Sequence, residues 1–401
     1  MRADLAIAGA GPVGLAVAIQ ARLHGLSAVV LERRRPPLDK ACGEGVMPLG
    51  VEELRAMGVR LPAGCAVRFA GIRFVDEETA AEGHFAAGPG LGVRRTLLSQ
   101  ALLERAQELG AELRFGAEVT GWCTPAPGRV RVELGGRAGA GALEAGLLVG
   151  ADGLHSAIRR RAGLESRSMR VARHGMRRHF RVALERPLVE VHWAQGAEAY
   201  LTPVGPDELG VALLWSGGPA RWDDLLARFP RLARRLADAT PTSRVLGAAR
   251  FEQRVCRRVA PGVALVGDAA GYLDPLTGEG ITLGLRCARA LVDVVARGAP
   301  LAEYERAYAE LSRTYYGLTG LLLAAARRPW LRRRVTRTLA RDPELFDRLL
   351  AIQGSGAPFG SLGLGGALRL LSGITLQGAA MRPSEATRTS TKRSTRRMKL
   401  L

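Results

Sequence analysis

The sequence predicts an α/β fold that begins with a Rossmann-like unit, carries an inserted mixed β-sheet and ends in a helical region. A glycine-rich turn separates an apolar strand from a helix near the N-terminus, strand-like apolar runs recur as far as residue 266, and helical spacing follows residue 300. The chain has 401 residues, of which 47% are hydrophobic and 24% charged. This is enough to bury a large core over two or three domains, and it excludes a disordered protein, a collagen and a coiled coil.

The first 32 residues are expected to form a βαβ unit. Residues 4–9 are apolar with little alternation, as in a buried parallel strand. Residues 13–25 have helical spacing and end at a glycine, which is a common helix stop. Residues 27–32 form a second apolar strand.

The following elements alternate between strands and one long helix. An amphipathic helix is expected over 95–110, because Leu98, Leu102, Ala106 and Leu109 fall on one stripe. Turn residues separate the strands expected at 112–115, 118–122, 130–134, 143–149, 180–184, 189–193, 209–215 and 263–266. A helix rich in Arg and Leu follows residue 215, another covers 281–295, and residues 300–350 are expected to be helical.

The turn between the first strand and helix reads Gly9-Ala10-Gly11-Pro12-Val13-Gly14. In a dinucleotide site, Gly9 allows the tight turn, Gly11 lets the backbone approach a pyrophosphate, and Gly14 lets helix and strand pack closely. The start of the helix offers free N–H groups to phosphates. Glu32 ends the second strand, where an acid can accept hydrogen bonds from ribose hydroxyls. The alternative is a packing turn with Glu32 as a surface acid.

Only one such fingerprint is present. Gly88-Pro89-Gly90 and Gly363-Leu364-Gly365 have no strand before them and no helix after them. We therefore expect a Rossmann unit for a single dinucleotide.

Two further motifs follow predicted strands. One runs from Leu147 through Asp152 and Gly153 to Arg159, and the other runs from Val263 through Gly267 and Asp268 to Gly271. Together with the N-terminal fingerprint, they resemble, in the same order, the three motifs of the FAD-dependent aromatic-hydroxylase superfamily (group A flavin monooxygenases). The resemblance covers about residues 1–300.

This resemblance implies the domain organisation. A glutathione-reductase-type FAD-binding domain would comprise residues 1–60, 94–165 and 250–300, with a substrate-binding domain at 61–93 and 166–249. A C-terminal helical region would cover 301–379, and a disordered basic tail 380–401. NAD(P)H would visit as a transient electron donor, because no second nucleotide fold is present.

The resemblance also implies roles for matching residues. Glu32, with Arg33 beside it, would hold the adenosine ribose; Arg95 would lie near the phosphate and ribityl groups; Asp152 would support the site; and Asp268 would bind a ribityl hydroxyl. On the residues alone, Asp152 and Asp268 also fit turn or helix-cap positions.

The segment from Asp274 to Ile281 opens another helix. Gly278 and Gly280 allow close backbone approach, and the helix start can accept an anion. In the superfamily this site, with Pro275 and Ile281, faces the pyrimidine edge of the flavin, where N–H groups favour the reduced, anionic form. An ordinary glycine-rich helix start is the alternative.

A subfamily marker lies at Lys40-Ala41-Cys42-Gly43-Glu44-Gly45, which looks like the CGEG-type segment of geranylgeranyl reductases. In those enzymes the segment lies against the flavin, and Gly43 and Gly45 would let the backbone pass close to the ring. Cys42 is either a redox-active or proton-donating thiol, or a small buried apolar side chain.

One departure separates this chain from those reductases. Their Tyr-x-Trp-x-Phe-Pro motif is reduced here to Tyr200-Leu201-Thr202-Pro203, without the aromatic pair. Tyr200 either lines a substrate cavity or is a sheet residue with an exposed hydroxyl. His174, His179 and His192 are candidates for acid–base work, although a lone histidine is more often structural. No metal-binding motif is present.

The net charge of +20 is concentrated near the C-terminus. Residues 327–341 hold seven arginines and no acid, and residues 381–401 hold seven basic residues and one acid. Solvated basic faces and a frayed tail are one interpretation; attraction to an anionic membrane or an acidic partner, with Trp330 and Arg332–Arg334 on an interfacial helix, is the other. We expect no nucleic-acid binding.

The cysteines and the N-terminus predict a cytoplasmic protein. The alternative within this prediction is a cytoplasmic protein that contacts the inner face of a membrane peripherally. The five cysteines are scattered and form no CxxC pair, and the N-terminus has no secretory signal pattern. The longest apolar run, residues 318–326, is too short to span a bilayer.

Three functions remain open at this stage. The first is an NAD(P)H-dependent monooxygenase that hydroxylates or epoxidises a phenolic, polyketide-like or lipid-like small molecule through a flavin C4a-hydroperoxide. The second is a geranylgeranyl-reductase-like enzyme that saturates C=C bonds. The third is a non-catalytic FAD-binding protein at a membrane or partner surface.

Overall fold

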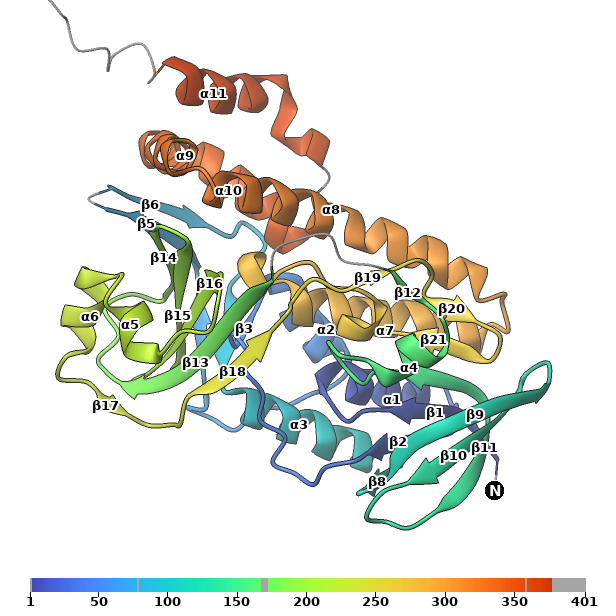
Figure 1. Ribbon diagram of the computed structural model, residues 1–401. Helices are drawn as coiled ribbons and strands as arrows, with labels where there is room; N and C mark the ends of the chain where they lie inside the picture. Colours follow the sequence, from blue (N-terminus) through green and yellow to red (C-terminus); the bar gives the residue numbers. More distant parts are fainter. Residues whose placement is uncertain (1, 78, 167–171, 358, 377–401) are drawn as a thin grey trace, which may run out of the picture.

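The N-terminal βαβ unit forms the centre of one large sheet in the computed structural model (Figure 1), which describes residues 2–77, 79–166, 172–357 and 359–376. Its parallel strands, in spatial order, are β21 (Val263–Leu265), β11 (Gly141–Gly150), β1 (Arg2–Ala8), β2 (Ala28–Glu32) and β8 (Glu112–Phe115). Antiparallel strands β20 (Val259–Ala260), β10 (Arg129–Gly135) and β9 (Glu118–Ala126) complete it. Helices α1 (Pro12–Leu23), α3 (Arg95–Glu108) and α7 (Gly280–Ala296) pack into the same core.

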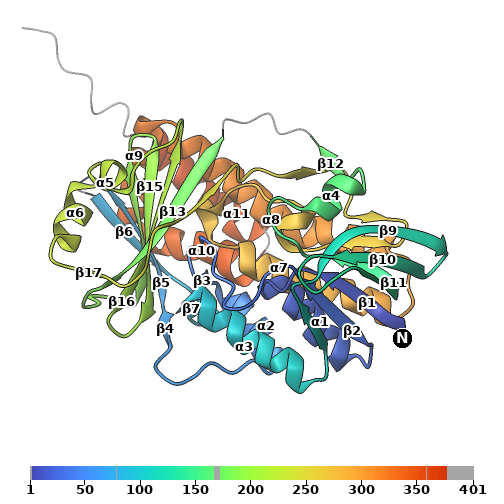
Figure 2. The ribbon, with the colours of Figure 1, turned by 60° about the horizontal axis from the view of Figure 1, so that its bottom comes forward.

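A second eight-stranded sheet stands at the opposite end of the molecule (Figure 2). Its strands are β5 (Gly71–Asp76), β6 (Thr79–His84), β13 (Arg173–Arg181), β14 (Leu188–Ala194), β15 (Ala197–Gly205), β16 (Glu208–Ser216), β17 (Thr240–Pro241) and β18 (Leu246–Ala249). Strand β14 runs parallel to β5 and the remaining pairs are antiparallel, so the sheet is mixed, as the sequence predicted. Helices α5 (Trp222–Leu226) and α6 (Pro230–Leu236) cover one face.

Several strands of this sheet differ from the sequence-based expectation. The strand expected at 180–184 runs instead from Arg173 to Arg181, and β5, β6, β15, β17 and β18 were not expected. Almost every β15 residue is buried, so it lacks the alternation that marks a half-buried strand. It also contains Pro203, and its pairing with β16 is irregular between Pro203 and Gly205.

Small elements connect the two large sheets. The three-stranded sheet consists of β3 (Gly45–Val46), β7 (Gly90–Val93) and β4 (Ala66–Phe69). The remaining elements are α2 (Pro48–Ala56), α4 (Ala157–Arg161), β12 (Glu165–Ser166), β19 (Arg254–Val255), and the short 3-10 helices η1 (Gly267–Ala270) and η2 (Pro275–Thr277). Because β3 begins at Gly45, the CGEG segment leads directly into the three-stranded sheet.

The C-terminal region consists of separate helices, not one continuous stretch. They are α8 (Ala302–Ala326), α9 (Pro329–Arg341), α10 (Pro343–Ser355), the 3-10 helix η3 (Phe359–Leu362) and α11 (Gly363–Leu376). The breaks precede Pro329 and Pro343, since a residue before proline disfavours the helical conformation. Asp342 caps α10 by accepting a hydrogen bond from the N–H of Leu345 at 3.0 Å.

Arg332 of α9 is buried and is not part of an exposed basic face, which corrects the expectation for that residue. Its guanidinium donates to both carboxylate oxygens of Asp76, at 2.8 and 3.1 Å, and to the carbonyl of Ala194 at 2.9 Å. The pair fastens α9 to the second sheet. No helix in the described ranges is long and apolar enough to cross a membrane, and the tail predicted at 380–401 lies outside those ranges.

Candidate functional site

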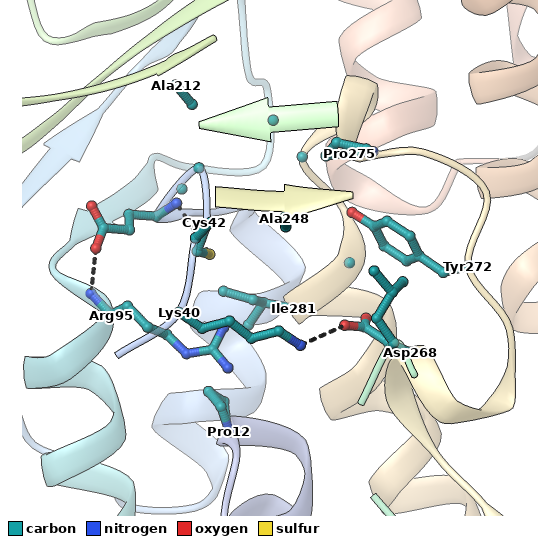
Figure 3. A pocket seen from close by; sticks show the side chains of 18 of the residues that line it. Pro12, Lys40, Cys42, Arg95, Ala212, Ala248, Asp268, Tyr272, Pro275 and Ile281 are labelled. Carbon is teal, nitrogen blue, oxygen red and sulfur yellow. Dashed lines mark hydrogen bonds and ion pairs between the residues drawn. The ribbon is translucent and has the colours of Figure 1, made fainter. Parts of the chain in front are cut away.

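One cavity lies between the two large sheets, and both contribute to its lining (Figure 3). The lining contains most of the residues singled out from the sequence: Gly9, Gly11, Pro12, Val13, Glu32, Cys42, Gly43, Glu44, Gly45, Arg95, Asp152, Gly153, Tyr200, Gly267, Asp268, Pro275, Gly278, Gly280 and Ile281. Segments from six parts of the chain, at 9–13, 32–45, 95, 152–153, 200 and 267–281, therefore meet around one space. Gly14 and Arg33 are not part of this lining.

The glycine-rich turn is packed too tightly for side chains. A Cβ on Gly14 would lie 2.0 Å from the carbonyl oxygen of Gly9, and a Cβ on Gly9 would lie 2.5 Å from that of Ala151. Gly14 thus serves the contact of α1 with the turn and not the cavity wall. Helix α1 starts without a side-chain cap at Gly11, so its first N–H groups are open to an anionic ligand.

Glu32 holds the turn in place from the end of β2. Its carboxylate accepts hydrogen bonds from the N–H of Ala10 and the N–H of Arg34, both at 3.0 Å. Arg33, which the resemblance placed beside the adenosine ribose, lies outside the cavity lining. Its exposed side chain points to Glu118, at 3.9 Å, while Arg34 lines the cavity.

Four buried polar atoms of residues that line the cavity have no partner in the described part of the chain. They are Nε of Arg95, Oγ of Ser99, Oδ1 of Asp152 and Nε of Arg177. Buried polar atoms normally have hydrogen-bond partners. The phosphates and hydroxyls of a bound dinucleotide would supply them, so these residues fit FAD. Asp152 serves the fold as well, because its Oδ2 accepts from the N–H groups of Ala157 and Ile158 at the start of α4.

Lys40 and Asp268 lie on opposite walls of the cavity. The ammonium of Lys40 is 3.9 Å from Oδ2 of Asp268, and Figure 3 shows the lysine side chain extending across the space. The side chains of Lys40 and Asp268 are 40% and 34% exposed. The contact is therefore a weak surface pair that a ligand can replace.

The loop before α7 is anchored by a buried charge cluster. Nε of Arg173 donates to Asp274 at 2.7 Å, and its NH2 group donates to Glu198 at 2.8 Å. Burial raises the pKa of Asp274 to about 6, although the Arg173 guanidinium opposes the shift. The hydroxyl of Tyr315 accepts from the backbone N–H groups of Leu273 and Asp274. These bonds fix the loop whose end faces the cavity.

Glu279 is the residue immediately before α7. Burial raises its pKa to about 8, and its Oε2 atom has no partner in the described structure. Helix α7 begins at Gly280 with no side-chain cap. Because the carboxyl is mostly protonated at neutral pH, it does not oppose an anionic group at this helix start.

A buried network fastens the CGEG segment to the second sheet. Glu44 is 2% exposed and adopts a left-handed backbone with φ of 60°. One carboxylate oxygen accepts from the N–H of Arg95 at 2.8 Å, and the other lies 2.5 Å from Nε2 of His179. The segment is thereby tied both to the start of α3 and to β13.

Arg177 completes this network and fixes the state of His179. Its NH1 group lies 3.2 Å from Nδ1 of His179, and NH2 donates to Asp39 at 2.5 Å and to the carbonyl of Lys40 at 3.2 Å. A guanidinium can only donate, so Nδ1 accepts and Nε2 carries the proton that points at Glu44. His179 is therefore a positioning residue, whose role the sequence left open.

The other two candidate histidines lie outside the cavity lining. His174 stacks on Trp215 with ring centroids 5.2 Å apart, and Nε2 of His192 lies 2.9 Å from Glu190. These contacts give His174 and His192 structural roles within the second sheet. Arg177 and Asp39 were not expected at the site, and no sequence pattern links them.

Tyr200 and Cys42 both line the cavity, with different partners. The Tyr200 hydroxyl donates to the carbonyl of Leu276 at 2.9 Å, and burial raises its pKa. Sγ of Cys42 accepts from the N–H of Glu44 at 3.4 Å. Tyr200 is thus engaged in holding the loop before α7, whereas the Cys42 thiol retains its proton-donating capacity.

The part of the lining from β5, β14 and β16 is apolar throughout. It consists of Ile72, Phe74, Val189, Val191, Ala212 and Leu214. The cavity therefore has a polar, glycine-rich side and an apolar side. No group of His, Cys, Asp or Glu in the described part of the chain can hold a metal ion.

Comparison with known proteins identifies the family. The model of the FAD binding domain family matches residues 2–315. Digeranylgeranylglycerophospholipid reductase 2 of Methanopyrus kandleri is 28% identical over 74% of this chain and 77% of its own. The 3-demethoxyubiquinol 3-hydroxylase of Escherichia coli is 30% identical over 77% of this chain and 84% of its own.

A solved structure shows the same fold over nearly the whole chain. A flavoprotein/dehydrogenase from Cytophaga hutchinsonii has a TM-score of 0.81 with 17% identity, over 95% of this chain and 100% of that one. The family match spans most of the chain, and the cavity it covers has the open helix starts and unpartnered polar atoms that FAD requires. The chain belongs to the FAD binding domain family of FAD-dependent oxidoreductases.

Proposed function

We propose that this protein is an NAD(P)H-dependent monooxygenase that hydroxylates or epoxidises a lipid-like substrate, such as a phenol with a long apolar chain. The observation that carries the proposal is the apolar wall built by β5, β14 and β16, directly opposite the glycine-rich FAD side. When bound, FAD supplies electron transfer from NAD(P)H and activation of dioxygen.

The apolar wall binds and orients the substrate. Ile72, Phe74, Val189 and Val191 belong to one packed cluster with the C-terminal helices, so the wall is rigid. Burying an apolar chain there is favourable by about 25 cal/mol for each Å² removed from water. Excluding water from the same space also protects an oxygen-transfer reaction from hydrolytic side reactions.

Two candidate acids named from the sequence, Tyr200 and His179, are engaged with protein partners, which supports oxygen transfer over hydride transfer to a C=C bond. Saturating such a bond needs an acid that delivers a proton to the second carbon. The Tyr200 hydroxyl already donates to Leu276, and the His179 proton points at Glu44. The Cys42 thiol, the Tyr272 hydroxyl and the Lys40 ammonium remain as candidate acids in this lining.

Product analysis with labelled dioxygen tests the proposal. The FAD-loaded protein is incubated with NADPH, labelled dioxygen and a long-chain alkylphenol, and the product is analysed by mass spectrometry. We expect one labelled oxygen atom in the product. Consumption of NADPH without labelled product, over alkylphenols and unsaturated lipids alike, would contradict the monooxygenase.

A C=C reductase is the second candidate, and Cys42 is the observation that favours it. The relative from Methanopyrus is named a phospholipid reductase, and the thiol lies on the cavity wall. Under anaerobic conditions a polyprenyl lipid would then gain hydrogen, and Cys42→Ser would abolish this gain. The monooxygenase predicts that Cys42→Ser leaves incorporation of labelled oxygen largely intact.

A further inference from the structure

Exposed apolar side chains gather on the C-terminal helices. Of the seven exposed large apolar side chains in the described ranges, five lie on α8, α9 and α11. Three of them, Leu364, Leu368 and Leu371, are 86%, 64% and 59% exposed. They fall at the spacing i, i+4 and i+7, so they form one face of α11.

The opposite face of α11 is packed against the protein. A Cβ on Gly373 would lie 2.5 Å from the side chain of Thr338 in α9, and Leu370 packs against the core beneath the C-terminal helices. Arg369 is held by Asp342 at 3.2 Å. The helix is therefore seated with its three leucines outward, at the outer edge of the molecule (Figure 1).

Basic residues precede and follow α11 in the sequence. Arg327 and Arg341 of the preceding helices are exposed and have no acidic partner among the residues that the structure describes. Residues 381–401, which follow α11, contain seven basic residues and one acidic residue. An apolar helix face bordered by basic residues is the pattern of a helix that lies in a membrane interface.

We propose that the leucine face of α11, defined by Leu364, Leu368 and Leu371, docks on a bilayer that contains anionic lipid. A second copy of the chain would bring two sets of basic residues together, which like-charge repulsion disfavours. A nucleic acid would use the charge but leave the leucines exposed to water. An anionic bilayer satisfies both features at once.

The C-terminal region that carries the leucine face also reaches the cavity. Leu322 of α8 lines the cavity, and the adjacent Leu321 is 64% exposed on the outside. On α10, Gln353 lines the cavity and donates to the carbonyl of Thr277 at 2.6 Å. Helices α8 and α10 of the same C-terminal region thus form part of the cavity wall. The inference rests on this surface and holds for either candidate reaction.

Vesicle flotation with the FAD-loaded, full-length protein tests the docking. We expect flotation with vesicles of mixed phosphatidylglycerol and phosphatidylcholine, weaker flotation at high salt, and little with phosphatidylcholine alone. Replacing the three leucines (Leu364→Ser, Leu368→Ser and Leu371→Ser) leaves the charge unchanged and should weaken binding about tenfold or more. Replacing the basic residues of 382–399 by glutamine should remove the preference for phosphatidylglycerol.

The matched control is the pair Leu23→Ser and Val245→Ser, which removes exposed apolar side chains elsewhere (45% and 37% exposed) and should float like the wild type. Absence of flotation by the wild type would overturn the proposal, as would unchanged flotation of the leucine variant. A dimer that the leucine variant dissociates in sedimentation, with no flotation, would assign the face to a second copy instead. Turnover of a detergent-dispersed substrate, unaffected by the leucine variant, separates docking from the proposed reaction.

Discussion

Glu279 controls how the stability of the cofactor-free protein depends on pH. Burial raises its pKa from 4.5 to about 8, so the folded protein holds the proton far more tightly than the unfolded chain. The stabilisation is complete below pH 4.5 and is lost as the pH rises towards 8. Between these values each pH unit costs about 1.4 kcal/mol. At neutral pH the accumulated cost is about 3 kcal/mol, and Glu279→Gln, which is always neutral, removes it.

Urea unfolding of the flavin-free protein at several pH values measures this effect. We expect Glu279→Gln to match the wild type near pH 4.5 and to exceed it by about 3 kcal/mol at neutral pH. Asp274, whose pKa is also raised, titrates in both proteins and cancels in the difference. Glu104→Gln removes an exposed carboxyl of α3 and serves as the control. Parallel curves for the wild type and Glu279→Gln would refute the reasoning.

Three further perturbations probe the remaining parts of the account. Asp76→Asn leaves the buried guanidinium of Arg332 uncompensated and should cost about 3–5 kcal/mol in urea unfolding; a loss below about 1 kcal/mol would contradict a buried ion pair. Gly14→Ala places a Cβ 2.0 Å from the carbonyl of Gly9, so the purified variant should lack flavin absorbance, and full absorbance would refute the packing role. Tyr200→Phe removes the hydrogen bond to the loop before α7 and should lower stability by about 1 kcal/mol without loss of FAD, as measured by unfolding and absorbance.

Local patterns predicted the FAD-binding side of the molecule well. The turn from Gly9 to Gly14 and the strands around it agree with the sequence-based expectation, because a glycine fingerprint and an apolar run are each readable within a few residues. The resemblance to flavin monooxygenases then brought distant motifs to one site. Arg33 was named from the sequence, whereas the cavity lining contains Arg34, because the direction of a side chain after the strand is set by the course of the chain and not by composition.

Long-range partners were beyond the reach of sequence patterns. Arg177 meets Asp39 across 138 residues, and Glu44 meets His179 across 135. Each residue alone reads as an ordinary charged or polar position. Helix α11 lies inside the helical region expected at 301–379, but its bounds were not predicted, since its glycine content lowers helix propensity and packing on α9 stabilises the helix.

The central claim is that the cavity between the two sheets holds FAD that NAD(P)H reduces and dioxygen reoxidises. The visible absorbance of the purified, FAD-loaded protein, followed through anaerobic addition of NADPH and then admission of air, tests it most directly. We expect one FAD per chain, bleaching on addition of NADPH, and recovery in air that a long-chain alkylphenol accelerates or couples to product. A protein that binds no FAD, or whose bound FAD neither NADPH nor NADH bleaches, would contradict it.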